Sequence, residues 1–183
     1  MYRKMMSLLL ALALVCACLP ALAATGSKTT DDLTTTTDTS DEAIIVVKPQ
    51  LTETAQGALN DLSAAVTGGG SAASYFPADV QSQIGAKLPA GTTTDDLKLS
   101  ELISLGAYNL DGAGDTIVST IGFATEYTDG QTVAVVFGYK DASGNMVWTT
   151  LDAVVVNGML KITFPVDLLK LAGSDAVLAV LSN

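Results

Sequence analysis

Short apolar runs with a period of two dominate the second half of the sequence, and few folds accommodate them. Apolar and polar residues alternate over 117–127, 131–140, 146–156 and 160–164. This alternation is typical of strands that bury one face. Turn residues separate the runs, and both Asp129-Gly130 and Asn157-Gly158 favour tight hairpins. The pattern predicts consecutive antiparallel strands in a mainly β domain.

Two helices are predicted ahead of these strands. Leu51–Val66 carries apolar residues at helical spacing, and the three glycines 68–70 end the pattern. A second helix is expected to begin at Pro77, which suits the first helical position, and to stop before Pro89.

Further strands are predicted on both sides of the alternating region. Ala43–Val47 is expected to be a strand buried on both faces, and Leu105–Leu110 and Ala176–Leu181 are also expected to be strands. The last of these could lie at a sheet edge open to a partner. Within 146–156 the apolar parity changes, which predicts a β-bulge near Thr149-Thr150.

These elements together predict an Ig-like two-sheet antiparallel sandwich with two helices inserted near its N-terminal part. The alternative is an α+β layer in which both helices cover one sheet.

Residues 1–23 have the features of a secretory signal peptide. A basic start precedes a short apolar run over Ser7–Leu19, and the small-residue sequence Ala21-Leu22-Ala23 follows. We therefore expect cleavage after Ala23 and a secreted protein. Both cysteines, Cys16 and Cys18, lie in this leader, so the mature chain would contain no thiol. The alternative is a lipid-anchored protein modified at Cys18, because the surrounding residues weakly match a lipobox.

The rest of the chain divides into a linker and one domain. Residues 24–42 are rich in Thr and Asp and have few apolar side chains, which predicts a disordered linker. Residues 43–183 are long enough for a single domain with a substantial core.

Composition excludes several classes of function. The chain has nine Lys and Arg against nineteen Asp and Glu, a net charge of −10, and no histidine. An acidic surface repels nucleic acid and anionic lipid, so we expect neither as a partner. We also expect no membrane insertion after cleavage of the signal peptide. No His general base or His metal ligand is available, and no serine is followed three residues later by lysine.

Two weaker patterns could carry chemistry, but each also has an ordinary structural interpretation. Glu101 and Glu126 could form the carboxylate pair of an acid-only glycoside hydrolase, although acidic residues on strands are usually solvated. Asn109, Asp111 and Asp115 offer oxygen donors for calcium on a glycine-rich loop, but the loop lacks the ligands of an EF-hand. We favour an ordinary turn for this loop. Apart from the calcium alternative, we expect no cofactor.

Aromatic residues fall in three successive predicted strands. Tyr127, Tyr139 and Trp148 could form an exposed row of rings that binds a carbohydrate. Both tyrosines share the parity of neighbouring phenylalanines, however, which favours burial.

Several turn and strand segments between residues 76 and 183 resemble those of a group of uncharacterised secreted bacterial proteins with a C-terminal antiparallel β module. The resemblance is carried by Phe76-Pro77, Lys87–Gly91, Leu97–Glu101, Tyr127–Gln131, Trp148-Thr149, Gly158–Phe164 and Leu178–Ser182. It implies a fold and no functional residues. The absence of a recognisable catalytic pattern, together with the signal peptide and the linker, leads us to expect a secreted, non-enzymatic module that binds a protein or a cell-envelope partner. The second hypothesis is a carbohydrate-binding module that contacts cell-wall glycan through the three aromatic residues.

Overall fold

The computed structural model describes residues 34–38, 43–123 and 127–183. The strands are β1 (Thr34–Asp38), β2 (Ile44–Val47), β3 (Lys98–Tyr108), β4 (Thr116–Gly122), β5 (Val133–Lys140), β6 (Met146–Val156), β7 (Met159–Pro165) and β8 (Ala176–Ser182). The helices are α2 (Glu53–Thr67), α3 (Ala78–Lys87) and α4 (Val166–Ala172), with single 3₁₀ turns η3 (Ala73–Tyr75) and η4 (Thr94–Asp96).

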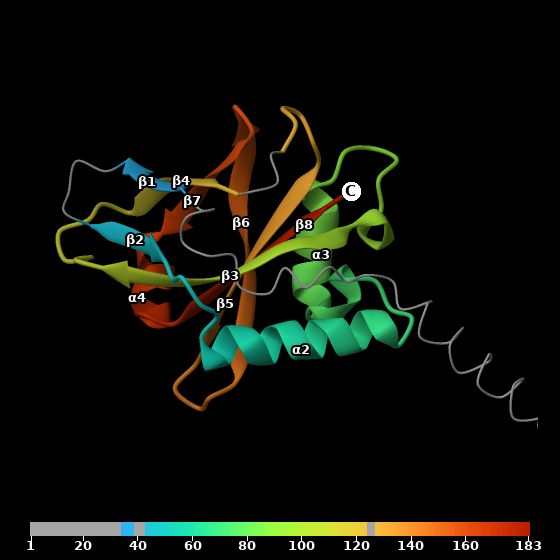
Figure 1. Ribbon diagram of the computed structural model, residues 1–183, viewed down its shortest axis with the longest axis horizontal. Coiled ribbons are helices and arrows are strands. Elements are labelled where there is room, and N and C mark those ends of the chain that lie inside the picture. Colours follow the sequence, from blue (N-terminus) through green and yellow to red (C-terminus); the bar gives the residue numbers. More distant parts are fainter. Residues whose placement is uncertain (1–33, 39–42, 124–126) are drawn as a thin grey trace, which may run out of the picture.

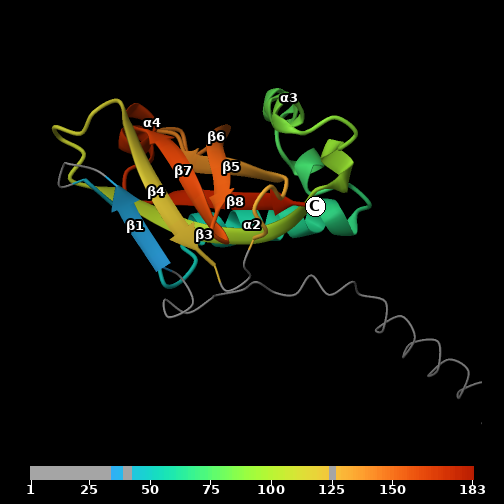
Figure 2. The same cartoon turned by 90° about the horizontal axis from the view of Figure 1, so that it is seen from above.

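All described strands belong to one antiparallel sheet with the order β1-β4-β7-β6-β5-β8-β3-β2. The seven strands from β4 to β2 curl until the sheet is nearly closed into a barrel, and β1 extends its β4 edge (Figures 1 and 2). The mainly β prediction is confirmed. The predicted two-sheet sandwich is wrong, because the strands form a single, nearly closed sheet accompanied by three helices.

Strand β6 explains why one sheet forms instead of two. Its first half, Met146–Leu151, pairs with β5, and its second half, Asp152–Val156, pairs with β7. Because β6 pairs with both β5 and β7, it connects the strands on its β5 side and those on its β7 side into one hydrogen-bonded sheet. The turn at Asp129-Gly130 does form, but it does not join paired strands, because β4 pairs with β1 and β7.

The predicted bulge near Thr149-Thr150 is also wrong. The register between β5 and β6 runs without interruption through these residues. Odd-numbered side chains such as Leu151 point into the barrel along the whole strand, whereas Trp148 points outward under the helices. Near the start of β6, even-numbered residues such as Trp148 pack under the helices and odd-numbered residues pack in the barrel, so apolar residues occur at both positions of the alternation. The register shift that does occur lies in β3, between Leu99 and Glu101.

Two apolar cores lie on the two faces of the sheet. The barrel interior is filled from most strands and includes Ile45, Leu105, Ile117, Ile121, Phe137, Leu160, Ile162, Phe164, Leu178 and Val180. The second core lies between the outer face of the sheet and the helices and includes Ala55, Leu62, Phe76, Val80, Ile84, Val136, Trp148, Val177, Ala179 and Leu181. Strands β5 and β8 contribute to both cores and are therefore apolar on both faces.

The helices form close to where the sequence places them. The side chain of Thr52 accepts a hydrogen bond from the Ala55 amide at the start of α2, and Gly68 ends this helix. Pro77 is the N-cap of α3. The third helix, α4, contributes Val166 and Leu169 to the barrel core. Helix α2 lies against β3 and β8, and α3 lies against β6. Figures 1 and 2 show β4 and β7 on the side away from α2.

The sheet edges differ from those expected. Strand β8 lies between β5 and β3, so it is not an edge strand. Among the described strands, β1 and β2 are the two ends of the sheet. Strand β2 buries only one face, because Ile44 and Val46 are outward and exposed. Its predicted burial on both faces is therefore wrong.

The N-terminal predictions fall mostly outside the described residues. The signal peptide, Cys16 and Cys18 lie there, as does most of the predicted linker, of which Thr34–Asp38 form β1. Among the described helices, none combines the length and the apolar character needed to cross a membrane.

Candidate binding site at the fork between two strands

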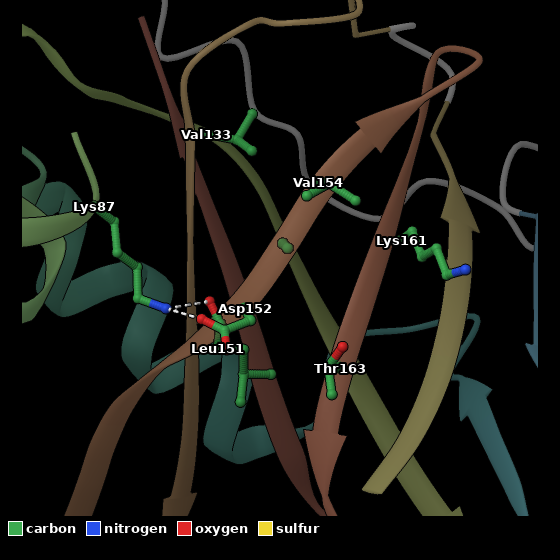
Figure 3. A pocket seen from close by; sticks show the side chains of 8 residues that line it. Lys87, Val133, Leu151, Asp152, Val154, Lys161 and Thr163 are labelled. Carbon is green, nitrogen blue, oxygen red and sulfur yellow. Dashed lines mark hydrogen bonds and ion pairs between the residues drawn. The ribbon is translucent and has the colours of Figure 1, made fainter. Parts of the chain in front are cut away.

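A hollow of about 440 Å³ opens on the outer side of the sheet, where β5 and β6 separate (Figure 3). We call it the fork hollow. Residues from α3, β5, β6 and β7 line it, namely Lys87, Val133, Leu151, Asp152, Ala153, Val154, Lys161 and Thr163.

The separation of the two strands creates the hollow. Pairing between β5 and β6 ends at Val135 and Leu151, although β5 begins two residues earlier, at Val133, and β6 continues to Val156. From Asp152 onward, β6 pairs with β7 instead. Among the described strands, none pairs with the edge of β6 that faces β5 beyond this fork.

Helix α3 reaches the fork through side chains one turn apart. The Nζ atom of Lys87 donates to the Leu151 carbonyl at 3.2 Å and forms an ion pair with Asp152. The Oε1 atom of Gln83 accepts from both the backbone amide and the hydroxyl of Thr150. Side chains of a helix thus bind polar groups of β6 on both sides of the point where its strand partner changes.

The sheet surface beside the hollow has no helix packed on it among the described elements. Val154 and Val156 point outward and are 56% and 41% exposed. Across the β6–β7 ladder, Val154 lies opposite Lys161, and Asp152 lies opposite Thr163. Val154 and Val156 are two residues apart on one strand, so they lie on the same outward face and form a small apolar surface.

The charge of the fork hollow differs from that of the whole chain. Two lysines and one aspartate line it, whereas acidic residues outnumber basic ones about two to one in the sequence. Lys87 is partnered by Asp152, and no acidic side chain lies within ion-pair distance of Lys161 among the described residues. The hollow therefore offers an ammonium group, a hydroxyl and apolar contacts to a ligand.

The aromatic residues predicted as a sugar platform lie on different faces of the sheet. Trp148 is 8% exposed and packs edge-to-face against Tyr75 and Phe76, with ring centroids 5.8 and 5.1 Å apart. Tyr127 and Tyr139 belong to the barrel core. The three rings are buried and do not form an exposed row.

Burial changes the ionisation of Tyr127. Loss of hydration raises the pKa of its hydroxyl to about 12, the hydrogen bond with Ser100 at 3.1 Å opposes this rise, and the nearby Glu101 carboxylate adds to it. Glu101 is itself buried, at 2% exposure, beside the bulge of β3. Its predicted catalytic partner, Glu126, lies outside the described residues.

The calcium candidates lie in the connection between β3 and β4. Asn109, Asp111 and Asp115 are all exposed, and Asn109 has the left-handed backbone conformation of a turn residue, with φ of 56°. In the part of the chain that the structure describes, no three His, Cys, Asp or Glu side chains come together as a metal site.

A second polar cluster ties α2 to the sheet. The Thr54 hydroxyl donates to Asp175 at 2.7 Å, and the Thr52 amide donates to the buried Ser104 hydroxyl at 2.9 Å. Burial would raise the pKa of Asp175, but hydrogen bonds from Thr52 and Thr54 and the charges of two nearby lysines hold it below its usual value. This cluster anchors the start of the helix.

Sequence reasoning missed the residues of the fork hollow. The three consecutive valines 154–156 could have indicated this face. A strand with one solvated face is expected to alternate apolar and polar residues, so a run of valines places apolar side chains on both faces. The chain matches no family model, no curated protein and no solved structure.

Proposed function

We propose that the protein is a secreted, non-enzymatic module that binds a protein partner through the outer face of β6 and β7 around the fork hollow. The exposure of Val154, at 56%, beside the hollow supports this proposal most directly. Burying such valines against a partner would remove apolar surface from water, which stabilises a complex.

Secretion rests on the sequence of the first 23 residues and is tested separately. Intact-mass spectrometry of the protein recovered from the culture medium should give a chain that begins at Ala24. A chain that begins at Cys18 and carries added lipid mass would instead establish the lipid-anchored form.

Site-specific crosslinking tests the binding face. A photoreactive amino acid is placed at Val156, or at Leu171 of α4 as a control, and the protein is exposed to the extracellular fraction of its own host. Leu171 is the most exposed large apolar residue described, at 66%, and does not line the hollow. We expect a discrete crosslinked protein from position 156 only, and its loss in Val154→Asp. Equal labelling from both positions, or labelling unchanged by Val154→Asp, would disprove the proposed face.

A further inference from the structure

Lys161 is the cation of the fork hollow that is available to a ligand. The ammonium of Lys87 is already shared between the Leu151 carbonyl and Asp152. Lys161 is exposed, and Thr163 lies two residues further along β7 on the same face, so an ammonium and a hydroxyl are presented side by side. These donors suit an oxyanion, and a hydrogen bond to a charged partner is stronger than one between neutral groups.

The chemistry of the hollow favours a carboxylate over a phosphate. Its lining contains no arginine, and an acidic chain repels a doubly charged anion more strongly than a singly charged one. Apolar surface from Val154 lies beside the donors, because Val154 is directly opposite Lys161. A carboxylate attached to an apolar group is complementary to both features.

The strand edge beyond the fork favours an extended backbone as the rest of the ligand. Residues Asp152–Val156 keep strand conformation, but among the described strands only β7 pairs with them. Backbone groups on the opposite edge can pair with an added strand. The exposed Val154 lies on the same segment and can contact alternate side chains of such a strand.

We propose that the fork hollow binds an extended peptide segment, with a carboxylate of the peptide held by Lys161 and its backbone paired along the free edge of β6. This inference deepens the proposed function and rests on it, because it states which part of a protein partner the hollow receives.

Titration with short peptides tests the inference. The probes are acetyl-Thr-Val-Thr-Val with a free C-terminal carboxylate, the same peptide with a C-terminal amide, and acetate alone. Binding is followed by changes in the backbone amide signals of isotope-labelled protein. We expect the free-acid peptide to shift the amide signals of 152–156 and 161–163, with affinity about tenfold weaker for the amide, since one charge-assisted hydrogen bond is lost.

Matched lysine variants make the test specific. Lys161→Gln should weaken binding of the free-acid peptide about tenfold and abolish the preference over the amide. Lys170→Gln, which changes another exposed lysine, on α4, should leave both the affinity for the free-acid peptide and its preference over the amide unchanged. Binding of acetate without peptide binding, equal affinities for acid and amide, or no shifts at all would each overturn the inference.

The crosslinking experiment distinguishes this inference from the proposed function. If Val154→Asp abolishes the crosslink from position 156 while Lys161→Gln leaves it intact, the binding face stands and the carboxylate site is wrong. If neither variant changes the crosslink, the proposed function itself is wrong, whatever the peptides do.

Discussion

The two halves of β6 have the same alternation of side chains but meet different surroundings. In the first half, the outward side chain of Trp148 is covered by η3 and α3 and is 8% exposed. In the second half, the outward side chain of Val154 is 56% exposed. Strand pattern alone therefore does not decide which outward residues stabilise the fold. The helix layer decides it, and the proposed binding face lies on the half whose outward valine stays exposed.

The largest expected effect is the loss of stability when Trp148 is truncated. Trp148→Ala should lower the free energy of unfolding by about 3–5 kcal/mol, because it leaves a cavity against Tyr75 and Phe76. Val154→Ala on the same strand should change it by about 0.5 kcal/mol or less. Denaturant unfolding measures both. In the wild-type protein, the fluorescence of this single tryptophan should be blue-shifted and protected from acrylamide. If Trp148→Ala and Val154→Ala lower the free energy of unfolding by similar amounts, the two halves of β6 do not differ in their contribution to stability.

The helices could be predicted from the sequence because their signals are local. The apolar spacing after Leu51, the Gly68–Gly70 stop and the position of Pro77 all lie within or next to the helices they define. The type I′ turn at Asn157-Gly158 is equally local, and both residues have the positive φ angles that it requires.

The barrel could not be predicted because it depends on distant pairings. Strand β4 pairs with β7, and β8 inserts between β5 and β3. Neither pairing leaves a mark in the strands themselves, because period-two alternation suits many partners. The fork hollow could not be predicted for the same reason, since Lys87 and Lys161 line one hollow only because α3 packs beside β6.

The second prediction concerns the barrel interior at alkaline pH. The pKa of Tyr127 is about 12 in the folded protein and about 10 when unfolded. The folded state therefore retains this proton over a range where the unfolded state loses it. Stability should be unaffected below pH 10 and should fall by about 2–3 kcal/mol as the pH rises to 12.

Tyr127→Phe provides the control for the alkaline prediction. This variant loses the hydrogen bond to Ser100, so it should be somewhat less stable at neutral pH. Its unfolding free energy should then lose less than that of the wild-type protein between pH 10 and 12. Denaturant unfolding at each pH measures both proteins. If both lose the same free energy of unfolding between pH 10 and 12, Tyr127 is not the cause of the loss.

The third prediction tests how closely the covered half is packed. Strand pairing places Gly138 directly opposite Trp148, and a Cβ atom added at Gly138 would lie 2.3 Å from the indole ring. Gly138→Ala should therefore destabilise the protein by about 1–3 kcal/mol through overpacking. Gly57→Ala on α2 is the matched control, because nothing lies within 4 Å of its added Cβ. It should stabilise the helix by about 0.5–1 kcal/mol. Thermal unfolding should move in opposite directions for the two variants.

The smallest expected effect comes from the ion pair that joins the helix-covered half to the open half. Lys87 and Asp152 are 33% and 86% exposed, so water and salt screen their attraction. A double-mutant cycle with Lys87→Met and Asp152→Asn should give a coupling energy of about 0.2–1 kcal/mol that shrinks as salt is added. Lys87→Met should cost slightly more than Asp152→Asn, because it also removes the hydrogen bond to the Leu151 carbonyl. A coupling above this range that persists in high salt would mean that the fork is a rigid part of the folded core. Helix α3 would then help to hold the outer face of β6 beside the fork hollow in place. The two halves of β6 would differ less in packing than the exposures of Trp148 and Val154 suggest.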